Sequence, residues 1–185
     1  MINMANKYDS TVAQLRGQFF KEGLIVPPLH EEHLNRIEAQ LGHHLPDDYR
    51  EFLRDYAGVG FPSATFPMME DGESRWASIF MFYGSSLADI YHQGRRNFDL
   101  EDGYKWYPGL RLVRNISVPV AVMEWPEELL RIGSDQGGNE ICLALFGFRP
   151  GAVFWWRNAP FSDADNLYLV ANSFDEFMHL IESGD

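Results

Sequence analysis

The sequence lacks the features on which secreted and membrane proteins depend. It has one cysteine, Cys142, so no disulfide can form within the chain and a reducing compartment is the default. No apolar run approaches the roughly 20 residues that a membrane-spanning helix requires. The opening segment, MINMANKYDS, has no apolar centre of the kind found in signal peptides. We therefore expect a soluble, cytoplasmic protein.

Basic residues are scarce as well. The chain has 15 lysines and arginines against 27 aspartates and glutamates, which gives a formal net charge of −12 at pH 7. A surface of this sign repels phosphate backbones and anionic lipids, so nucleic acids and membranes are poor partners. A basic protein is a favourable partner, because opposite potentials speed encounter and help to orient docking.

The apolar content is sufficient for one folded domain. Of the 185 residues, 45% are hydrophobic and 15% are aromatic. This composition argues against global disorder, and the length is short for two domains. No internal repeat, low-complexity tract or linker rich in Pro, Gly or Ser divides the chain.

Three helices are predicted in the first third of the chain. The first begins at Ser10 or Thr11, the second runs from about His30 to Leu41, and the third lies in LPDDYREFLRDYAG, residues 45–58. Gly42 stands where the second helix needs a left-handed cap. The apolar residues that recur with helical spacing, and that we expect to be buried, are Val12, Leu15 and Phe19; Leu34, Ile37 and Leu41; and Tyr49, Phe52, Leu53 and Tyr56.

The rest of the chain reads mainly as short strands followed by one more helix. Strand-like segments between residues 110 and 171 are LRLV, VPVAVM, ELLRIG, EICLALFGF, AVFWWR and LYLVA. A helix is expected from Ser86 to about Phe98, and another in SFDEFMHLIES, where Ser173 and Glu176 form a capping box. This order indicates an α+β fold, with a largely antiparallel curved sheet and helices packed at N-terminal, middle and C-terminal positions.

The segment RIGSDQGGNEICLAL, residues 131–145, sets two glycines between a polar cluster and an apolar run. A phosphate-binding loop needs a following helix, whereas a strand is expected here. A calcium loop needs alternating carboxylates, and Asp135 has too few companions. Since Gly and Asn tolerate positive φ, residues 135–139 are predicted to form a hairpin turn. Side chains should then pack on both faces of the following strand, with Ile141, Leu143 and Leu145 on one face and Cys142 and Ala144 on the other.

Four blocks in this order, LPDDYREFLRDYAG, LLRIGSDQGGNEICLAL, GAVFWWRN and SFDEFMHLI, are together similar to the SUKH superfamily. That superfamily groups bacterial immunity proteins with fungal regulators of cell-wall synthesis, and the resemblance covers about His30 to Ile181. The family's helix start corresponds here to Leu45, Pro46 and Tyr49. Its glycine hairpin and the strand that follows correspond to Gly137, Gly138, Asn139, Ile141 and Leu143. Its closing helix corresponds to Ser173, Phe174 and Phe177.

The resemblance implies a SUKH-like domain over residues 30–185, preceded by an N-terminal helical extension, residues 1–29. Two departures from the family pattern are the enlarged middle segment, residues 61–119, and Ala57-Gly58, where the family often has Asn-Gly. The implied function is that of an immunity protein that binds and neutralises a cognate toxin by occlusion. The charge favours a basic toxin, such as a nuclease. The alternative is a non-catalytic regulatory or scaffold module of the cell-wall regulator type.

No residue pattern indicates catalysis, a cofactor or a metal. His30 and His33 could share a helix face, but no third ligand is evident nearby. Cys142 lies in an apolar strand rather than in the exposed, electropositive pocket that a nucleophilic thiol needs. Asp47 and Asp48 follow a proline at a helix start, where the helix dipole accounts for them. We therefore expect no enzymatic activity and no cofactor.

Two kinds of residue are candidates for contact with a protein partner, and the oligomeric state stays open. Adjacent strand residues point to opposite faces, so one of Trp155 and Trp156 is expected in the core and the other is a candidate anchor. Two acidic clusters flank aromatic residues in segment 61–119; they could meet a basic partner, or they are solvated loops. The clusters are Glu70, Asp71 and Glu73, and Asp99, Glu101 and Asp102; the aromatic residues are Trp76, Tyr104, Trp106 and Tyr107.

Overall fold

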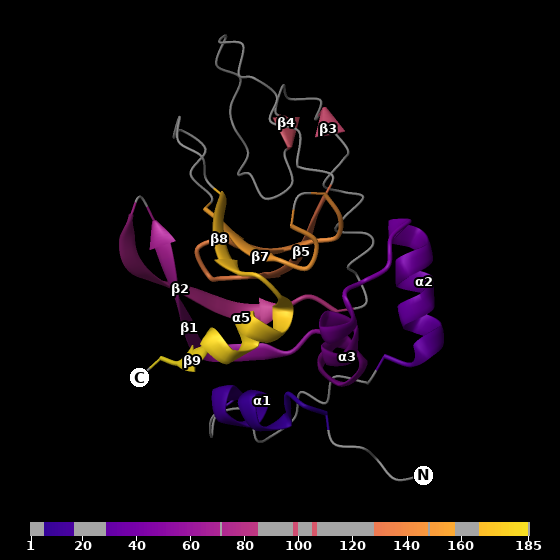
Figure 1. Cartoon of the computed structure of the whole chain (residues 1–185), viewed down its shortest axis with the longest axis horizontal. Coiled ribbons are helices and arrows are strands. Elements are labelled where there is room, and N and C mark those ends of the chain that lie inside the picture. The colour runs from indigo at the N-terminus through magenta and orange to yellow at the C-terminus, as the bar shows by residue number, and fades with distance from the viewer. Residues whose placement is uncertain are drawn as a thin grey trace.

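In the computed structural model, the residues described are 6–16, 29–70, 72–84, 98–99, 105–106, 128–147, 149–157 and 167–184. They form an α+β fold, which confirms the predicted class (Figure 1). The helices are α1 (Asp9–Arg16), α2 (Glu31–Leu41), α3 (Asp47–Tyr56) and α5 (Phe174–Leu180). The strands are β1 (Gly60–Glu70), β2 (Glu73–Phe82), β3 (Phe98–Asp99), β4 (Lys105–Trp106), β5 (Leu129–Ser134), β6 (Glu140–Ala144), β7 (Val153–Trp156), β8 (Leu167–Ala171) and β9 (Glu182–Ser183).

A single antiparallel sheet organises the described residues. Its strand order is β8-β7-β6-β5-β2-β1-β9, and β3 and β4 form a separate two-stranded pair. Strand β1 also packs against β8, although β7, β6, β5 and β2 lie between them in the sheet. The sheet is therefore strongly curved, as predicted.

The main core fills the inner face of this curved sheet, where α1, α3 and α5 are packed (Figure 1). Its centre is a group of aromatic rings from different elements. The ring centroid of Phe52 in α3 lies 4.8 Å from that of Phe82 in β2 and 5.0 Å from that of Phe174 in α5. Tyr8, just before α1, packs edge-on against Phe52 at 5.7 Å. Such contacts stabilise a core beyond the area that they bury.

The helix predictions are largely confirmed. In α2 the predicted apolar residues are buried, and Gly42 caps the helix with a φ of 74°. In α3, Tyr49, Phe52 and Leu53 are buried, but Tyr56 is only partly buried and its hydroxyl group donates a hydrogen bond to Asp9. Val12 and Leu15 of α1 are buried in the main core, whereas Phe19 lies outside the described residues.

Residues 6–16 are fastened to the rest of the core. The Asn6 side-chain amide donates a 2.9 Å hydrogen bond to the Glu51 carbonyl of α3. The ammonium group of Lys7 lies 2.9 Å from a carboxylate oxygen of Asp175 in α5. The division between residues 1–29 and 30–185 stays a prediction, but α1 shares one core with the sheet.

The strand predictions hold for ELLRIG, EICLALFGF, AVFWWR and LYLVA, which contain β5, β6, β7 and β8. LRLV, VPVAVM and most of the helix expected from Ser86 to Phe98 lie outside the described residues, and Phe98 itself is in β3. The hairpin of β1 and β2 was not predicted. Proline and glycine in the β1 sequence GFPSATFPMME hide the strand pattern, because both residues are unusual inside strands.

The predicted turn is present, and one of the two hydrogen bonds of the predicted capping box is present. Asp135 accepts hydrogen bonds from the backbone N–H groups of Gly137 and Asn139, at 2.8 and 2.9 Å, and Gly138 has a φ of 81°. This turn joins the antiparallel strands β5 and β6. At α5 the Ser173 hydroxyl accepts from the backbone N–H of Glu176 at 3.0 Å, while the Glu176 carboxylate accepts from the N–H of Asn172 rather than that of Ser173.

Candidate interaction surface

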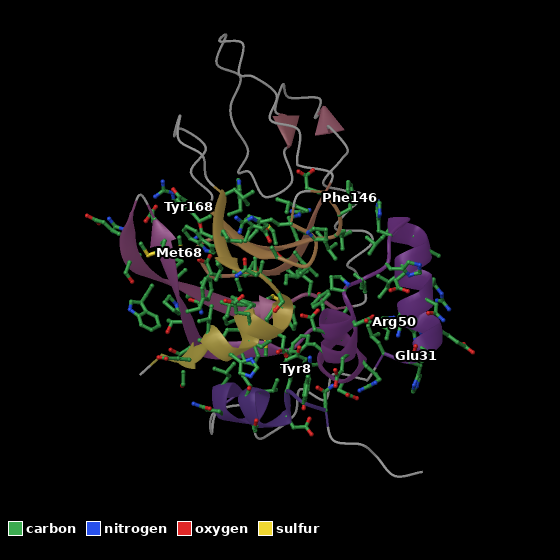
Figure 2. All side chains as sticks on the ribbon, viewed as in Figure 1. Tyr8, Glu31, Arg50, Met68, Phe146 and Tyr168 are labelled. Atoms are coloured by element: carbon green, nitrogen blue, oxygen red, sulfur yellow. The ribbon has the colours of Figure 1, made fainter. Side chains whose placement is uncertain are left out.

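Glu70, one of the predicted partner-binding carboxylates, is a structural residue. Its side chain is largely buried, its carboxylate lies 3.1 Å from Arg75 Nε, and it also pairs with Arg157, which follows β7. The Arg157 guanidinium lies over the ring of Tyr168 in β8, 5.7 Å from its centroid. Figure 2 shows Met68 of β1 and Tyr168 of β8 on the same side of the molecule. Glu70 therefore ties β1 to the other end of the curved sheet, and its burial argues against a role in contact with a partner.

The other predicted carboxylates are only partly placed by the structure. Glu73 is exposed at the start of β2 and pairs with Arg75 at 2.9 Å. Asp99 is in β3, but its side chain is not among those described. Asp71, Glu101 and Asp102 lie outside the described residues. The part of the chain that the structure describes thus does not bring the two acidic clusters together. Among their carboxylates whose side chains are described, Glu73 remains a candidate for contact with a partner.

The two adjacent tryptophans point to opposite faces of β7, as predicted, but neither is an exposed anchor. Trp155 is 8% exposed and belongs to the main core. Trp156 is 6% exposed and packs in a second cluster with Leu129, Cys142 and Ala144. The predicted packing on the second face of β6 is confirmed, and the burial of both tryptophans argues against either as an anchor for a partner.

Among the described residues, the exposed aromatic side chains lie instead on the β1–β2 hairpin. Its strands pair directly across at Thr65–Ser78, Pro67–Trp76 and Met69–Ser74, so these side chains share one side of the hairpin. Trp76 is 60% exposed, Met69 is 56% exposed, and Phe80 follows along β2 at 38%. We call this surface the hairpin face, defined by Thr65, Pro67, Met69, Ser74, Trp76, Ser78 and Phe80.

A depression adjoins the hairpin face where β1 and β2 approach the turn between β5 and β6. Its volume is about 200 Å³. Its lining combines small hydroxyl-bearing residues, the aromatic residue Phe80 and two residues of the turn. The lining residues are Ser63, Ala64, Thr65, Ser78, Ile79, Phe80, Gln136 and Gly137.

The hairpin face is uncharged, and the charge that adjoins it is negative. Glu182 of β9 lies directly across from Thr65, so its exposed carboxylate is on the same side. None of the seven residues that define the face is charged. Elsewhere in the described chain, carboxylates hold many of the cations, as in the 2.8 Å pair of Arg50 and Glu31 that joins α3 to α2 (Figure 2). The basic residues held in this way are Lys7, Arg50, Arg54, Arg75, Arg131 and Arg157.

A buried ionisable group that was not predicted lies at the start of β6. The Glu140 carboxylate accepts a 2.8 Å hydrogen bond from the Tyr83 hydroxyl and lies 3.8 Å from Arg131 Nη1. Burial raises the pKa of Glu140 to about 7, and the attraction of Arg131 and the hydrogen bond from Tyr83 only partly oppose this shift. The sequence signal was weak, because a glutamate beside a turn is expected to be solvated.

The residues considered for chemistry do not assemble a reactive site in the described chain. Cys142 is fully buried, and burial raises the pKa of its thiol, which disfavours the reactive thiolate. His30 and His33 stack with ring centroids 6.0 Å apart at the start of α2. Asp48 accepts a 2.9 Å hydrogen bond from the backbone N–H of Asp175, so it helps to cap α5. Among the described residues, no three His, Cys, Asp or Glu side chains are grouped to hold a metal ion.

No described helix is long and apolar enough to cross a lipid bilayer.

Comparison with known proteins agrees with the fold. The model of the SMI1/KNR4 family (SUKH-1) matches residues 28–179. That range covers α2 through most of α5 and leaves out α1. The chain is also similar to the SPbeta prophage-derived uncharacterized protein YokK of Bacillus subtilis (strain 168). The two are 25% identical over 163 residues, which cover 80% of this chain and 71% of that protein.

Proposed function

This chain belongs to the SMI1/KNR4 family (SUKH-1), and on that premise we propose that it is an immunity protein that binds a basic toxin domain and neutralises it. The observation that carries the proposal is the family match over residues 28–179, because the family includes immunity proteins. The toxin's substrate is not set by this match. A nuclease is favoured, because an enzyme that acts on a polyanion commonly carries a basic active surface.

The charge of the chain supports a basic partner. The net charge is −12, and many of the described arginines are already paired with carboxylates. The surface available to a partner is therefore negative on balance. Such a surface accelerates encounter with a basic domain and competes with a polyanionic substrate for the same cations.

Neutralisation by occlusion needs no chemistry from this chain. A bound acidic protein that covers the toxin's active surface excludes the substrate sterically and electrostatically. The described residues fit that role, since the lone thiol is buried and the carboxylates examined above serve as caps, ion pairs or exposed charges. The proposal therefore includes no catalytic residue and no cofactor.

Co-expression tests the proposal. A candidate toxin domain, identified from the genes that neighbour the gene for this chain, is expressed in a bacterial host with and without the chain. Cell growth and toxin activity are measured. We expect growth to be restored and a one-to-one complex to co-purify. A toxin that binds but stays fully active would refute neutralisation. Capture of several unrelated proteins instead of one toxin would favour the regulatory or scaffold role.

A further inference from the structure

The hairpin face has the composition of a protein-binding surface. The inference drawn from it rests on the proposed function. We infer that the basic toxin domain docks on the hairpin face, with Trp76 as the central contact and the adjoining depression as the place that receives one of its side chains. The exposed apolar residues are contiguous. Pro67 lies directly across from Trp76, and Met69 is two residues further along β1.

Exposed single hydrophobic residues are common, but a contiguous group is not. Tryptophan and methionine are enriched at the centres of protein interfaces, and tryptophan carries a large share of the binding energy in many of them. Trp76 is flanked along its strand by Ser74 and Ser78, whose side chains are small. Because Trp76 is 60% exposed, its indole ring offers both a wide apolar surface and an N–H donor.

The open edge of β1 is a poorer docking site than the hairpin face. The Ser63 carbonyl accepts a hydrogen bond from the backbone N–H of Gly184, which follows β9. Alternate residues of a strand direct their backbone N–H and C=O groups to the same side, so those of Thr65, Pro67 and Met69 also point toward the β9 edge of β1. Strand β9 pairs only with the first part of β1. Pro67 then offers no N–H where an added strand would need one. A partner is accordingly expected to cover the face rather than extend the sheet.

The size and lining of the depression favour a side chain over a small-molecule ligand. Its volume of about 200 Å³ is below the roughly 300–1,000 Å³ of most ligand pockets. Its lining includes the aromatic residue Phe80 and the hydroxyl-bearing residues Thr65 and Ser78. A lysine or arginine can place its apolar stem against the ring and its charged end among the hydroxyl groups and solvent.

The charge of the face distinguishes a basic partner from a second copy of this chain. The defining residues are uncharged, and the adjoining Glu182 is negative. Arg75 is held by Glu70 and Glu73, so it does not offset this charge. Two copies would bring net charges of −12 together, whereas a basic domain would be attracted.

The affinity of the toxin domain for variants of the chain with single substitutions tests the inference. The probe is the toxin domain encoded beside the gene, titrated calorimetrically with wild type, Trp76→Ser, Met69→Ser and Leu169→Ser. Leu169 is the matched control, because it is 37% exposed but lies on β8, outside the hairpin face. Circular dichroism and thermal unfolding confirm that each variant folds. Light scattering reports the oligomeric state of the free chain.

We expect Trp76→Ser to weaken binding by about tenfold or more, Met69→Ser to weaken it less, and Leu169→Ser to leave it unchanged. Added salt should weaken binding of the wild type. Equal binding by wild type, Trp76→Ser and Met69→Ser would overturn the inference and leave the proposed function standing. No binding or protection by the wild type would refute the proposed function as well. A wild-type dimer that Trp76→Ser converts to monomers would assign the face to a second copy instead.

Discussion

Replacing Glu140 by glutamine should change how the stability of the fold depends on pH. The Glu140 side chain is buried beside Tyr83 and Arg131, and burial raises its pKa from the ordinary 4.5 to about 7. A carboxyl whose pKa is raised by folding binds its proton more tightly in the folded state than in the unfolded state. Its contribution to stability is therefore present at low pH and is lost as the pH rises from about 4.5 to about 7.

The magnitude follows from the two pKa values of Glu140. The interval from 4.5 to about 7 corresponds to about 3 kcal/mol of unfolding free energy, because one pKa unit is about 1.4 kcal/mol. Between pH 5 and pH 8 the folded protein should lose about 2–3 kcal/mol through this group alone. Glutamine at the same position does not ionise, so the Glu140→Gln variant should not show this loss.

Urea unfolding at pH 5 and pH 8, followed by circular dichroism, measures the effect. The stability of Glu140→Gln relative to wild type should increase by about 2–3 kcal/mol from pH 5 to pH 8. Any pH-independent cost of weakening the contact with Arg131 cancels in this comparison. Glu32→Gln, on the exposed side of α2, is the control for losing a carboxylate at the surface. A change below about 0.5 kcal/mol, or one of opposite sign, would show that the Glu140 carboxyl is solvated.

Three further substitutions or labelling experiments test the fold. Phe52→Ala should lower the unfolding free energy by about 3–5 kcal/mol, because Phe52 is fully buried among five other rings; a loss under about 1 kcal/mol in urea unfolding would show that the core is placed wrongly. Ser173→Ala should cost about 1 kcal/mol by the same assay, through loss of the α5 cap, and no loss would mean that the cap is replaced by solvent. Cys142 should resist a thiol reagent in the native protein and react only after unfolding; rapid native labelling, measured by mass spectrometry, would contradict its burial.

Local patterns were sufficient to predict the helices and the glycine turn. In α2 the spacing of Leu34, Ile37 and Leu41 identifies one buried stripe, and Gly42 marks its end. The Asp135–Asn139 turn depends on hydrogen bonds among residues within four positions of one another. Because these preferences act over a few residues, they can be read before the rest of the chain is placed. The alternation in β6 likewise predicted packing on both faces of the strand.

The candidate surface could not be predicted in the same way. Glu70 belongs to an acidic run in the sequence, yet it is buried because the curved sheet brings Arg157 to it. Trp155 and Trp156 alternate as predicted, but both faces of β7 are covered. Trp76 was noted only as the neighbour of a charged cluster. Its exposure became evident once the pairing of β1 with β2 placed it beside Pro67 and Met69 on an open face.

The sequence by itself determined the α+β class, the family, the acidic charge and the local signals of helices and turn, because each depends on composition or on residues close along the chain. Only the tertiary structure decided which charges are buried and which aromatic residues are exposed. Burial depends on what strands and helices distant in sequence cover. The contacts of Glu70 and Glu140, like the openness of Trp76, arise from the curvature and pairing of the whole sheet.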